Sequence, residues 1–235
     1  MYKVSLIIPC YNEANNLPLL INHCAKVFTN DTVQVVLVNN GSSDNSEDVM
    51  KDLMTKHSFI RMVKVDTNTG YGNGILAGLR TSKTKILAWT HADMQTDPTD
   101  ILEGLKIINT ENHQFFIKGK RFGRPLIDVL FTIGMSLFET LFLRKIMWDI
   151  NAQPTIFSRK FFDTWQDPPN DFSLDLFAYY QAKISGLEIR RFNVCFGKRT
   201  HGTSHWNISW VAKINFIKRT LIYSFKLRKK LKSNV

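Results

Sequence analysis

Short apolar runs rich in β-forming residues alternate with helical patterns along the first part of this chain. The runs at 4–9, 33–38, 59–65 and 85–90 predict strands, and the patterns at 15–28, 46–57 and 72–82 predict helices. Uninterrupted apolar strands joined by helices indicate a mainly parallel sheet with helices on both faces. The sequence therefore predicts an α/β fold. Asp44 and Glu47 have the spacing of a capping box at the start of the second helix.

The length and composition favour one globular domain. The chain has 235 residues, 44% of them apolar, and neither an internal repeat nor a low-complexity linker divides it. We expect a domain over residues 1–205 and a basic segment over 206–235. Cys10, Cys24 and Cys195 are scattered without a CxxC pair, which argues against disulfides and zinc. No signal-peptide pattern follows Met1, so we expect a cytoplasmic location.

Three polar turns follow the first, second and fourth predicted strands. They read PCYNE, NNGSSDNS and THADMQTDP. Ligands of such sheets bind beyond the carboxyl ends of the strands, so we expect these turns to lie together. In the third turn His91, Asp93, Gln95 and Asp97 occupy alternate positions, which share one side of an extended chain. They could converge on a metal ion, or they could form only a polar turn.

Glycines mark the entry to the third predicted helix. Gly70, Gly72 and Gly74 lie in NTGYGNGILAG, without the Gly-Lys-Ser/Thr ending of a P-loop, and the first strand has no GxGxxG. We interpret these glycines as permitting a tight turn and close helix packing, with phosphate contact as the alternative.

The polar turns recur in a fixed order that is known from one family. Pro-x-Tyr-Asn-Glu, a partial Asp-Asp-Gly-Ser-x-Asp, Asn-x-Gly-x-Gly, a modified Asp-x-Asp-x-Gln, KGKRF and RTHGTS follow one another between about residues 3 and 206. The chain thereby resembles family 2 glycosyltransferases of the GT-A fold, especially the branch of dolichyl- and undecaprenyl-phosphate sugar synthases. The resemblance implies a Rossmann-like, mainly parallel central sheet. Large apolar residues at helical spacing from Trp210 to Phe225, with lysines and arginines around them, separately predict a C-terminal amphipathic helix.

The resemblance also implies roles for individual residues. A nucleotide-diphosphate sugar would contact Pro9, Tyr11, Glu13, Asn39, Asn40, Asp44, Gly70, His91, Ala92 and Asp93. A divalent cation, Mn²⁺ or Mg²⁺, would bind Asp93, Gln95 and His91. Arg121 and Arg199 would contact phosphates of donor or acceptor; Gly202 and Ser204 complete the last motif. Cations belong in such a site because charge builds on the departing diphosphate.

The chain departs from the family pattern at three of these positions. Asn39 and Asn40 stand where acids are common, and His91 replaces the first acid of the metal motif. An amide donates as well as accepts hydrogen bonds, so base recognition could differ. We expect a preference for Mn²⁺ if His91 binds the metal, and no such preference if His91 contacts the ribose.

The nature of the acceptor depends on whether a general base is present. Transfer to a sugar hydroxyl needs a carboxylate to take the proton, whereas a lipid phosphate is already an anion. Asp175 is the first candidate for a base and Asp149 the second. The alternative is that both are acids favoured at helix starts by the helix dipole.

Two segments suggest a membrane surface. Residues 126–148 are very apolar, but their uncharged run at 129–138 is shorter than the roughly 20 residues of a spanning helix. This segment could be a core helix; the resemblance favours a helical insertion lying at the interface. Twelve of the 31 basic residues follow Glu188, the last acid, and they alternate with large apolar residues. We expect this C-terminal helix to bind anionic lipid, and not nucleic acid, so that the protein lies peripherally on the inner face of the membrane.

These features predict an inverting glycosyltransferase. It would move a sugar from a nucleotide-diphosphate donor to a membrane-associated acceptor, either polyprenyl phosphate or a lipid-linked glycan, in cell-surface polysaccharide or glycoconjugate synthesis. The alternatives are a transferase that extends a glycan on a hydroxyl with Asp175 as base, and a non-catalytic module that binds sugar nucleotides.

Overall fold

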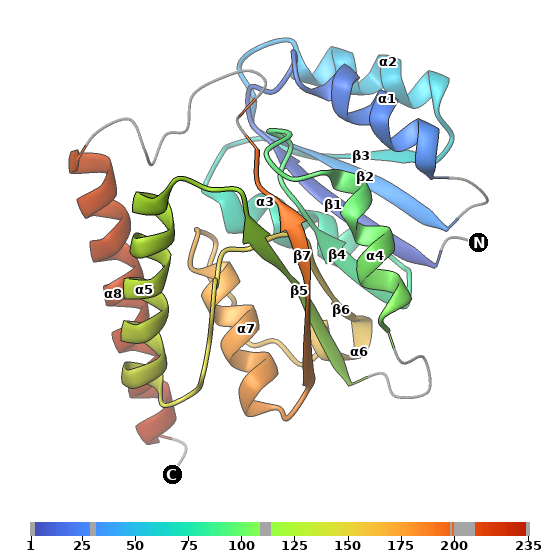
Figure 1. Ribbon diagram of the computed structural model, residues 1–235. Helices are drawn as coiled ribbons and strands as arrows, with labels where there is room; N and C mark the ends of the chain where they lie inside the picture. The colour runs from blue at the N-terminus through green and yellow to red at the C-terminus, as the bar shows by residue number, and fades with distance from the viewer. Residues whose placement is uncertain (1–2, 29–31, 109–113, 198, 200–209, 234–235) are drawn as a thin grey trace.

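A seven-stranded sheet organises the protein (Figure 1). The computed structural model describes residues 3–28, 32–108, 114–197, 199 and 210–233. The strand order is β3-β2-β1-β4-β6-β5-β7; β6 runs antiparallel to β4 and β5, and the other neighbouring strands are parallel. The strands are β1 (Val4–Cys10), β2 (Val33–Asn40), β3 (Ile60–Val65), β4 (Ile86–Trp89), β5 (Phe115–Phe122), β6 (Thr155–Ser158) and β7 (Glu188–Cys195).

Helices cover both faces of this sheet, as the sequence predicted. Because side chains alternate along a strand, Leu6 and Ile8 of β1 pack with α1, α2 and α4, whereas Ile7 packs with α3 on the opposite face. The helices are α1 (Leu17–Val27), α2 (Ser46–Lys56), α3 (Tyr71–Thr81), the 3₁₀ helix η1 (Pro98–Asp100), α4 (Ile101–Lys106), α5 (Leu126–Leu143), α6 (Arg159–Phe162), α7 (Leu174–Ile184) and α8 (Trp210–Ser233).

The predicted elements from β1 to β4 are confirmed with small shifts at their ends. The predicted capping box is wrong. Asp44 does accept a hydrogen bond from the backbone N–H of Ser46 at 3.0 Å, but Glu47 does not reach back to the helix start. Its carboxylate is held by Lys51 at 2.7 Å and by Lys64 at 2.9 Å, two cations that outcompete a backbone donor.

The glycines before α3 permit close packing, which confirms their interpretation. Gly70 has φ 135°, and a Cβ there would lie 2.4 Å from the carbonyl oxygen of Asn170. A Cβ on Gly72 would lie 2.6 Å from the carbonyl oxygen of Asp171. The start of α3 therefore fits directly against the loop that precedes α7.

Helices α5 and α8 lie side by side and run in the same direction at the edge of the molecule away from α1 and α2 (Figure 1). The Phe142 and Phe225 rings meet with centroids 4.7 Å apart, and the hydroxyl of Ser224 donates to the buried carboxylate of Glu139 at 2.7 Å. Burial raises the pKa of Glu139 to about 7. Among the described residues, α5 alone is long and apolar enough by composition to cross a membrane, with a mean hydropathy of 1.8 over 18 residues. The uncharged run at 129–138 thus lies inside α5, and α5 lies inside the expected helical segment 126–148.

Candidate functional site

The first two polar turns are fastened together by Asn12. Its backbone is left-handed, with φ 57°, and its side-chain oxygen accepts the N–H groups of Ser43 at 2.8 Å and Asp44 at 3.3 Å. The backbone N–H of Glu13 donates to the Ser46 hydroxyl at 2.9 Å. The loops after β1 and β2 therefore form one rigid rim, on which Tyr11 is 42% exposed.

The two asparagines at the end of β2 use their amides within the protein. Nδ2 of Asn39 donates to Glu47 at 3.2 Å, and its Oδ1 accepts the N–H of Ser42 at 3.0 Å. Nδ2 of Asn40 donates to the carbonyl of Gly70 at 3.0 Å, which ties β2 to the start of α3. In both places the amide N–H₂ faces an oxygen, so an aspartate there would be repelled. The departure from the family's acids thus has a local structural reason.

Ring stacking joins the glycine turn at the start of α3 to the metal motif. The Tyr71 ring lies between the rings of Phe172, at 4.6 Å, and His91, at 5.3 Å. Burial lowers the pKa of His91, despite the opposing effect of Asp93 and Asp175, so its imidazole is neutral at pH 7. The metal motif is therefore anchored on α3 by its first residue.

The four alternating residues of the metal motif do not all converge. Met94 has φ 58°, and this left-handed residue breaks the extended conformation on which the alternation depends. Asp97 points elsewhere: its carboxylate accepts the N–H of Thr99 at 2.8 Å and pairs with His23 at 3.1 Å. For Asp97, the structure therefore favours the polar turn that the sequence left open as the alternative.

Asp93 is instead paired with Arg199. The ion pair measures 2.8 Å, and Asp93 is 5% exposed beside the buried Ala92. Gln95 accepts the N–H of Gly197 at 2.7 Å through its backbone carbonyl, and its side-chain Nε2 donates back to Gly197 at 3.3 Å. The segment after β7 is thus fastened along the metal motif; Gly202 and Ser204 lie outside the described residues.

The fit of a cation to this motif depends on a second source of ligands. Within the described ranges, no three His, Cys, Asp or Glu side chains lie close enough to hold a metal by themselves. Mg²⁺ commonly takes one or two carboxylates together with substrate phosphates. Asp93, with the neighbouring Gln95, therefore fits a divalent cation that binds along with a diphosphate.

Charges from three of the turns influence one another at this edge of the sheet. Burial raises the pKa of Glu13, and Asp93 and Asp44 act in the same direction, while Arg199 opposes them. Pro9 lies beneath, at the end of β1, where a Cβ on Gly74 would approach it to 3.1 Å. The predicted donor residues are therefore gathered in one region.

Asp175 is buried beside a lysine. It is 2% exposed, lies 3.6 Å from Nζ of Lys118 and accepts a hydrogen bond from Gln153 at 2.8 Å. Burial raises the pKa of Asp175 and lowers that of Lys118 to about 8, while each charge favours the other. Nζ of Lys118 also donates to the hydroxyl of Thr155 at 2.8 Å, so Asp175 lies in a buried polar cluster with Lys118 and Gln153.

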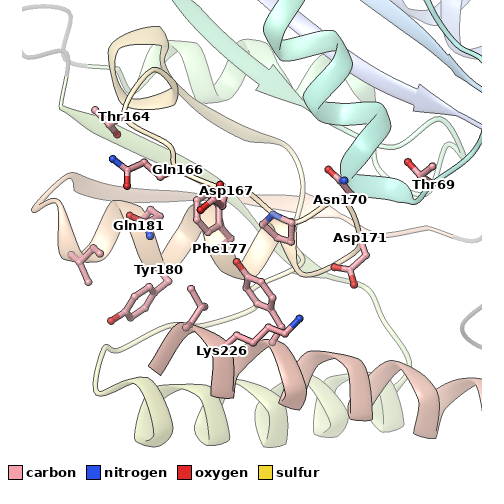
Figure 2. Close-up of a pocket in the computed structure, with 14 residues that line it drawn as sticks. Thr69, Thr164, Gln166, Asp167, Asn170, Asp171, Phe177, Tyr180, Gln181 and Lys226 are labelled. Atoms are coloured by element: carbon pink, nitrogen blue, oxygen red, sulfur yellow. The ribbon is translucent and has the colours of Figure 1, made fainter. Parts of the chain in front are cut away.

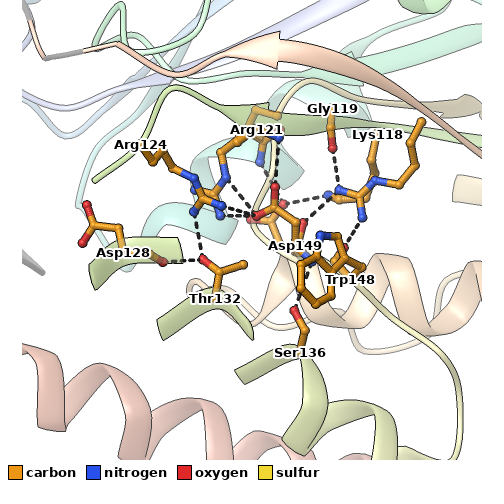
Figure 3. A network of polar contacts seen from close by, with 12 residues as sticks. Lys118, Gly119, Arg121, Arg124, Asp128, Thr132, Ser136, Trp148 and Asp149 are labelled. Atoms are coloured by element: carbon orange, nitrogen blue, oxygen red, sulfur yellow. Dashed lines mark hydrogen bonds and ion pairs between the residues drawn. The ribbon is translucent and has the colours of Figure 1, made fainter. Parts of the chain in front are cut away.

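Asp149 lies at the centre of a cluster of arginines (Figure 3). The backbone N–H of Arg121 donates to its carboxylate at 3.0 Å, Nε of Arg121 at 2.9 Å and a second guanidinium nitrogen as well; Arg124 approaches to 3.8 Å. Burial acts to raise the pKa of Asp149, but these arginines outweigh it and the pKa is lowered. The hydroxyl of Ser136 on α5 accepts the backbone N–H of Asp149 at 3.1 Å.

A third arginine supports the same cluster through the backbone. Arg191 of β7 donates to the carbonyls of Trp148, of Gly119 at 2.5 Å and of Asp149 at 3.2 Å (Figure 3). The three guanidinium groups around one carboxylate leave an excess of positive charge at this end of α5. Such an excess suits a phosphate.

Several residues of the site were not predicted. Tyr71, Phe172, Gln153, Lys118, Arg124 and Arg191 all hold predicted residues in place. Lys118 and Arg124 lie in KGKRFGRP, whose density of cations was the one available signal.

Comparison with known proteins agrees with this arrangement. Residues 5–129, more than half of the chain, match the family model of Glycosyl transferase family 2. The chain belongs to this family. The resemblance to the polyprenyl-phosphate sugar synthase branch is also supported, because this family 2 chain is 34% identical over 103 residues to undecaprenyl-phosphate 4-deoxy-4-formamido-L-arabinose transferase of Yersinia enterocolitica. That match covers 42% of the chain and 31% of the relative. The protein of the same name from an Enterobacter species is 34% identical over 104 residues, which cover 43% of the chain and 32% of that protein. The match thus spans about a third of the length of these curated relatives.

Solved structures of glycosyltransferases share the fold. Glucosyl-3-phosphoglycerate synthase from Mycobacterium tuberculosis, in complex with Mn²⁺, UDP and glucosyl-3-phosphoglycerate, superposes with a TM-score of 0.72 at 13% identity, over 96% of this chain and 79% of that one. A mannosyltransferase from Pyrobaculum calidifontis, in complex with GDP-mannose and Mn²⁺, superposes with a TM-score of 0.64 at 16% identity. That superposition covers 85% of this chain and 58% of the mannosyltransferase. The predicted GT-A fold of this glycosyltransferase is confirmed.

Proposed function

We propose that this family 2 glycosyltransferase moves a sugar, with inversion, from a nucleotide-diphosphate donor to a polyprenyl phosphate at a membrane surface. The observation that carries the proposal is the arginine cluster around Asp149, together with the pairing of both candidate bases, Asp149 and Asp175, with cations of the protein. The undecaprenyl-phosphate transferases that the chain resembles support the same acceptor.

On the donor side, the rim of the first two turns would hold the nucleoside and the metal motif the diphosphate. Glu13 and Asp44 would bind the nucleoside, Tyr11 would border the base, and His91, held on the Tyr71 ring, would lie nearer the ribose. A cation on Asp93 and Gln95 would neutralise the leaving diphosphate. Arg199, already 2.8 Å from Asp93, is placed to bind the same phosphates.

On the acceptor side, Arg121 would orient the lipid phosphate. A phosphate oxygen then attacks the anomeric carbon from the face opposite the diphosphate, forming one C–O bond while the bond to the β-phosphate oxygen breaks. Since the attacking oxygen already carries negative charge, no proton has to be removed. Asp149 would hold Arg121 in position, and Asp175 would hold Gln153 and Lys118; neither acts as a base in this proposal.

The acceptor class can be decided with Asp175→Asn. We expect purified protein to transfer labelled sugar from one of the UDP-, GDP- or CMP-linked donors to polyprenyl phosphate, and Asp175→Asn to keep its rate within about tenfold. A general base would contribute about 10²–10⁴-fold, so its loss would be unmistakable. The measurement is initial rate against matched polyprenyl-phosphate and glycan acceptors.

The control removes both buried charges. Asp175→Asn leaves Lys118 without its counter-ion, which costs stability, so Lys118→Gln with Asp175→Asn separates loss of fold from loss of chemistry. A well-folded double variant without activity, together with transfer by wild type to a glycan hydroxyl, would establish the hydroxyl-acceptor alternative. Nucleotide binding without sugar transfer to either acceptor would favour the non-catalytic module.

The membrane surface in the proposal is the outer face of α5. Leu126, Leu130, Leu137 and Leu141 are 82%, 66%, 57% and 70% exposed, an unusual amount of bare apolar surface for one helix. The neighbouring helix α8 is rich in basic residues, and the guanidinium of Arg228 lies over the Phe142 ring of α5, 4.7 Å from its centroid. An apolar face flanked by cations is typical of helices that lie on anionic bilayers.

Vesicle binding tests this surface. We expect wild type to sediment with phosphatidylglycerol-containing vesicles and Leu130→Asp with Leu137→Asp to remain in solution, since each buried leucine contributes about 1.5–3 kcal/mol. Leu19→Asp on α1, where Leu19 is 44% exposed, is the matched control and should sediment like wild type. Equal sedimentation of all three proteins would contradict a docking role for α5.

A further inference from the structure

A cavity lies between α7, α8 and the loop before α7 (Figure 2). Its volume is about 650 Å³, within the range of small-molecule sites. Asn170 and Asp171 line the end nearest α3, Tyr180 and Gln181 of α7 line one wall, and Lys226 of α8 lines another (Figure 2). None of these residues belongs to the donor site described above.

Several polar side chains that line this cavity have no hydrogen-bond or ion-pair partner among the described residues. Tyr180 is 2% exposed, yet its hydroxyl has no hydrogen-bond partner among the described residues. Within the same part of the chain, the side chains of Gln181, Tyr223 and Lys226 also make no hydrogen bond or ion pair. Burial raises the pKa of Tyr180, so its phenol is protonated and can both donate and accept.

The walls between these groups are aromatic and aliphatic. Phe177 and Leu227 are 3% and 5% exposed and pack with Tyr223 in the core cluster behind the cavity. A ligand here therefore meets apolar faces and, around them, phenol, amide, carboxylate and ammonium groups. An aliphatic chain would leave those polar groups unsatisfied.

The charges of the lining nearly balance. The charged side chains of the lining are Asp167, Asp171 and Lys226, two acids and one base, and Asp171 lies 3.8 Å from Arg219. A lining without a surplus of cations gives a phosphate no net attraction, whereas a neutral ligand needs none.

From these contacts we infer that the cavity between α7 and α8 binds a neutral saccharide. Sugar hydroxyls donate and accept hydrogen bonds together, so they can satisfy phenols, an amide and carboxylates at once. The C–H faces of a pyranose pack on aromatic rings such as those of Phe177 and Tyr223. The cavity is a saccharide site separate from the donor site, and it does not depend on which acceptor the enzyme uses.

The loop before α7 connects this cavity to the donor site, because it contacts both. The carbonyl of Asn170 accepts the N–H of Asn73 at 2.8 Å and lies against Gly70. Two residues further on, Phe172 stacks on Tyr71, which stacks on His91. A saccharide held by Asn170 and Asp171 would therefore contact the same loop whose residues pack against the metal motif.

Saturation-transfer NMR with simple glycosides tests the assignment. The probes are methyl α-D-glucopyranoside, methyl α-D-mannopyranoside and N-acetylglucosamine, each at millimolar concentration, with inorganic phosphate followed in parallel by ³¹P line broadening. We expect saturation transfer to at least one glycoside with wild-type protein. Tyr180→Phe removes a single hydroxyl and should weaken binding roughly 2- to 10-fold.

Matched variants make the result specific. Tyr179→Phe removes the neighbouring hydroxyl, whose ring packs on Phe116 at 5.8 Å on the core side, and should bind like wild type. Asp93→Ala should also bind like wild type, which separates this site from the donor site. Gln181→Leu, on the cavity wall, provides a second loss if Tyr180→Phe folds poorly. Absence of transfer to every glycoside, equal binding by all variants, or a preference for phosphate would overturn the assignment.

Discussion

Asp93→Ala is expected to abolish the dependence of nucleotide binding on a divalent cation and to lower the rate of sugar transfer by at least about 100-fold. Asp93 supplies the carboxylate of the metal motif, and His91 and Gln95 carry no negative charge that could replace it. Calorimetry with UDP, GDP and CMP, each with Mn²⁺, Mg²⁺ or chelator, measures the effect. Residual affinity of the variant should be the same in all three conditions.

Asp97→Ala is the matched control for this experiment. It removes the same charge from the same turn, but from a carboxylate that caps η1 through Thr99 and pairs with His23. We expect it to cost about 1 kcal/mol of stability through loss of the cap and to leave cation-dependent binding intact. Cation-dependent binding that survives in Asp93→Ala, or disappears equally in both variants, would show that the metal is held elsewhere.

Asp149→Ala is expected to lower the free energy of unfolding by about 3–5 kcal/mol. The change leaves Arg121 and Arg124, whose side chains are 14% and 7% exposed, without the carboxylate between them. Urea denaturation followed by circular dichroism measures the loss. Because the folded-state pKa of Asp149 is lowered, its contribution is complete above the unfolded pKa of about 3.9 and is lost as the pH falls through the folded value.

Asp52→Ala provides the comparison for an exposed ion pair. Asp52 pairs with Lys56 at 2.6 Å on the surface of α2, and both side chains are more than half exposed. Its loss should cost less than about 1 kcal/mol. If Asp149→Ala is no less stable than Asp52→Ala, the arginine cluster does not depend on Asp149, and Asp149 becomes available again as a candidate base.

The sequence was informative wherever the local pattern and the fold agreed. The strands from β1 to β4 are apolar runs, and the turns after them are recognisable because parallel strands bring their carboxyl ends to one edge. The strands β5 and β7 escaped prediction because FFIKGKRF and EIRRFNVC mix cations into the run. Apart from the exposed Lys120, those cations are buried or half-buried, and their partners lie far along the chain, as Asp175 does for Lys118. No local sequence pattern indicates such partners.

The sequence left parts of the site open for similar reasons. Asp93 and Asp97 would share one side only along an extended backbone, and the left-handed Met94 between them was not foreseeable from residue type. Spacing could not distinguish a carboxylate that faces solvent from one enclosed by arginines, as Asp149 is. The amides of Asn39 and Asn40 looked like altered base recognition, and their contacts with Glu47 and Gly70 emerged only from the fold.

Helix α5 connects the exposed leucines and the arginine cluster within a single helix. Its outer side presents the exposed Leu130 and Leu137, while Thr132 receives a hydrogen bond from Arg124 at 2.8 Å and Ser136 one from the backbone of Asp149 at 3.1 Å. If this helix rests on a bilayer as proposed, the depth to which its leucines sink also sets the height of the arginines above the lipid headgroups. The helix would then hold the guanidinium groups at the depth at which a lipid exposes its phosphate.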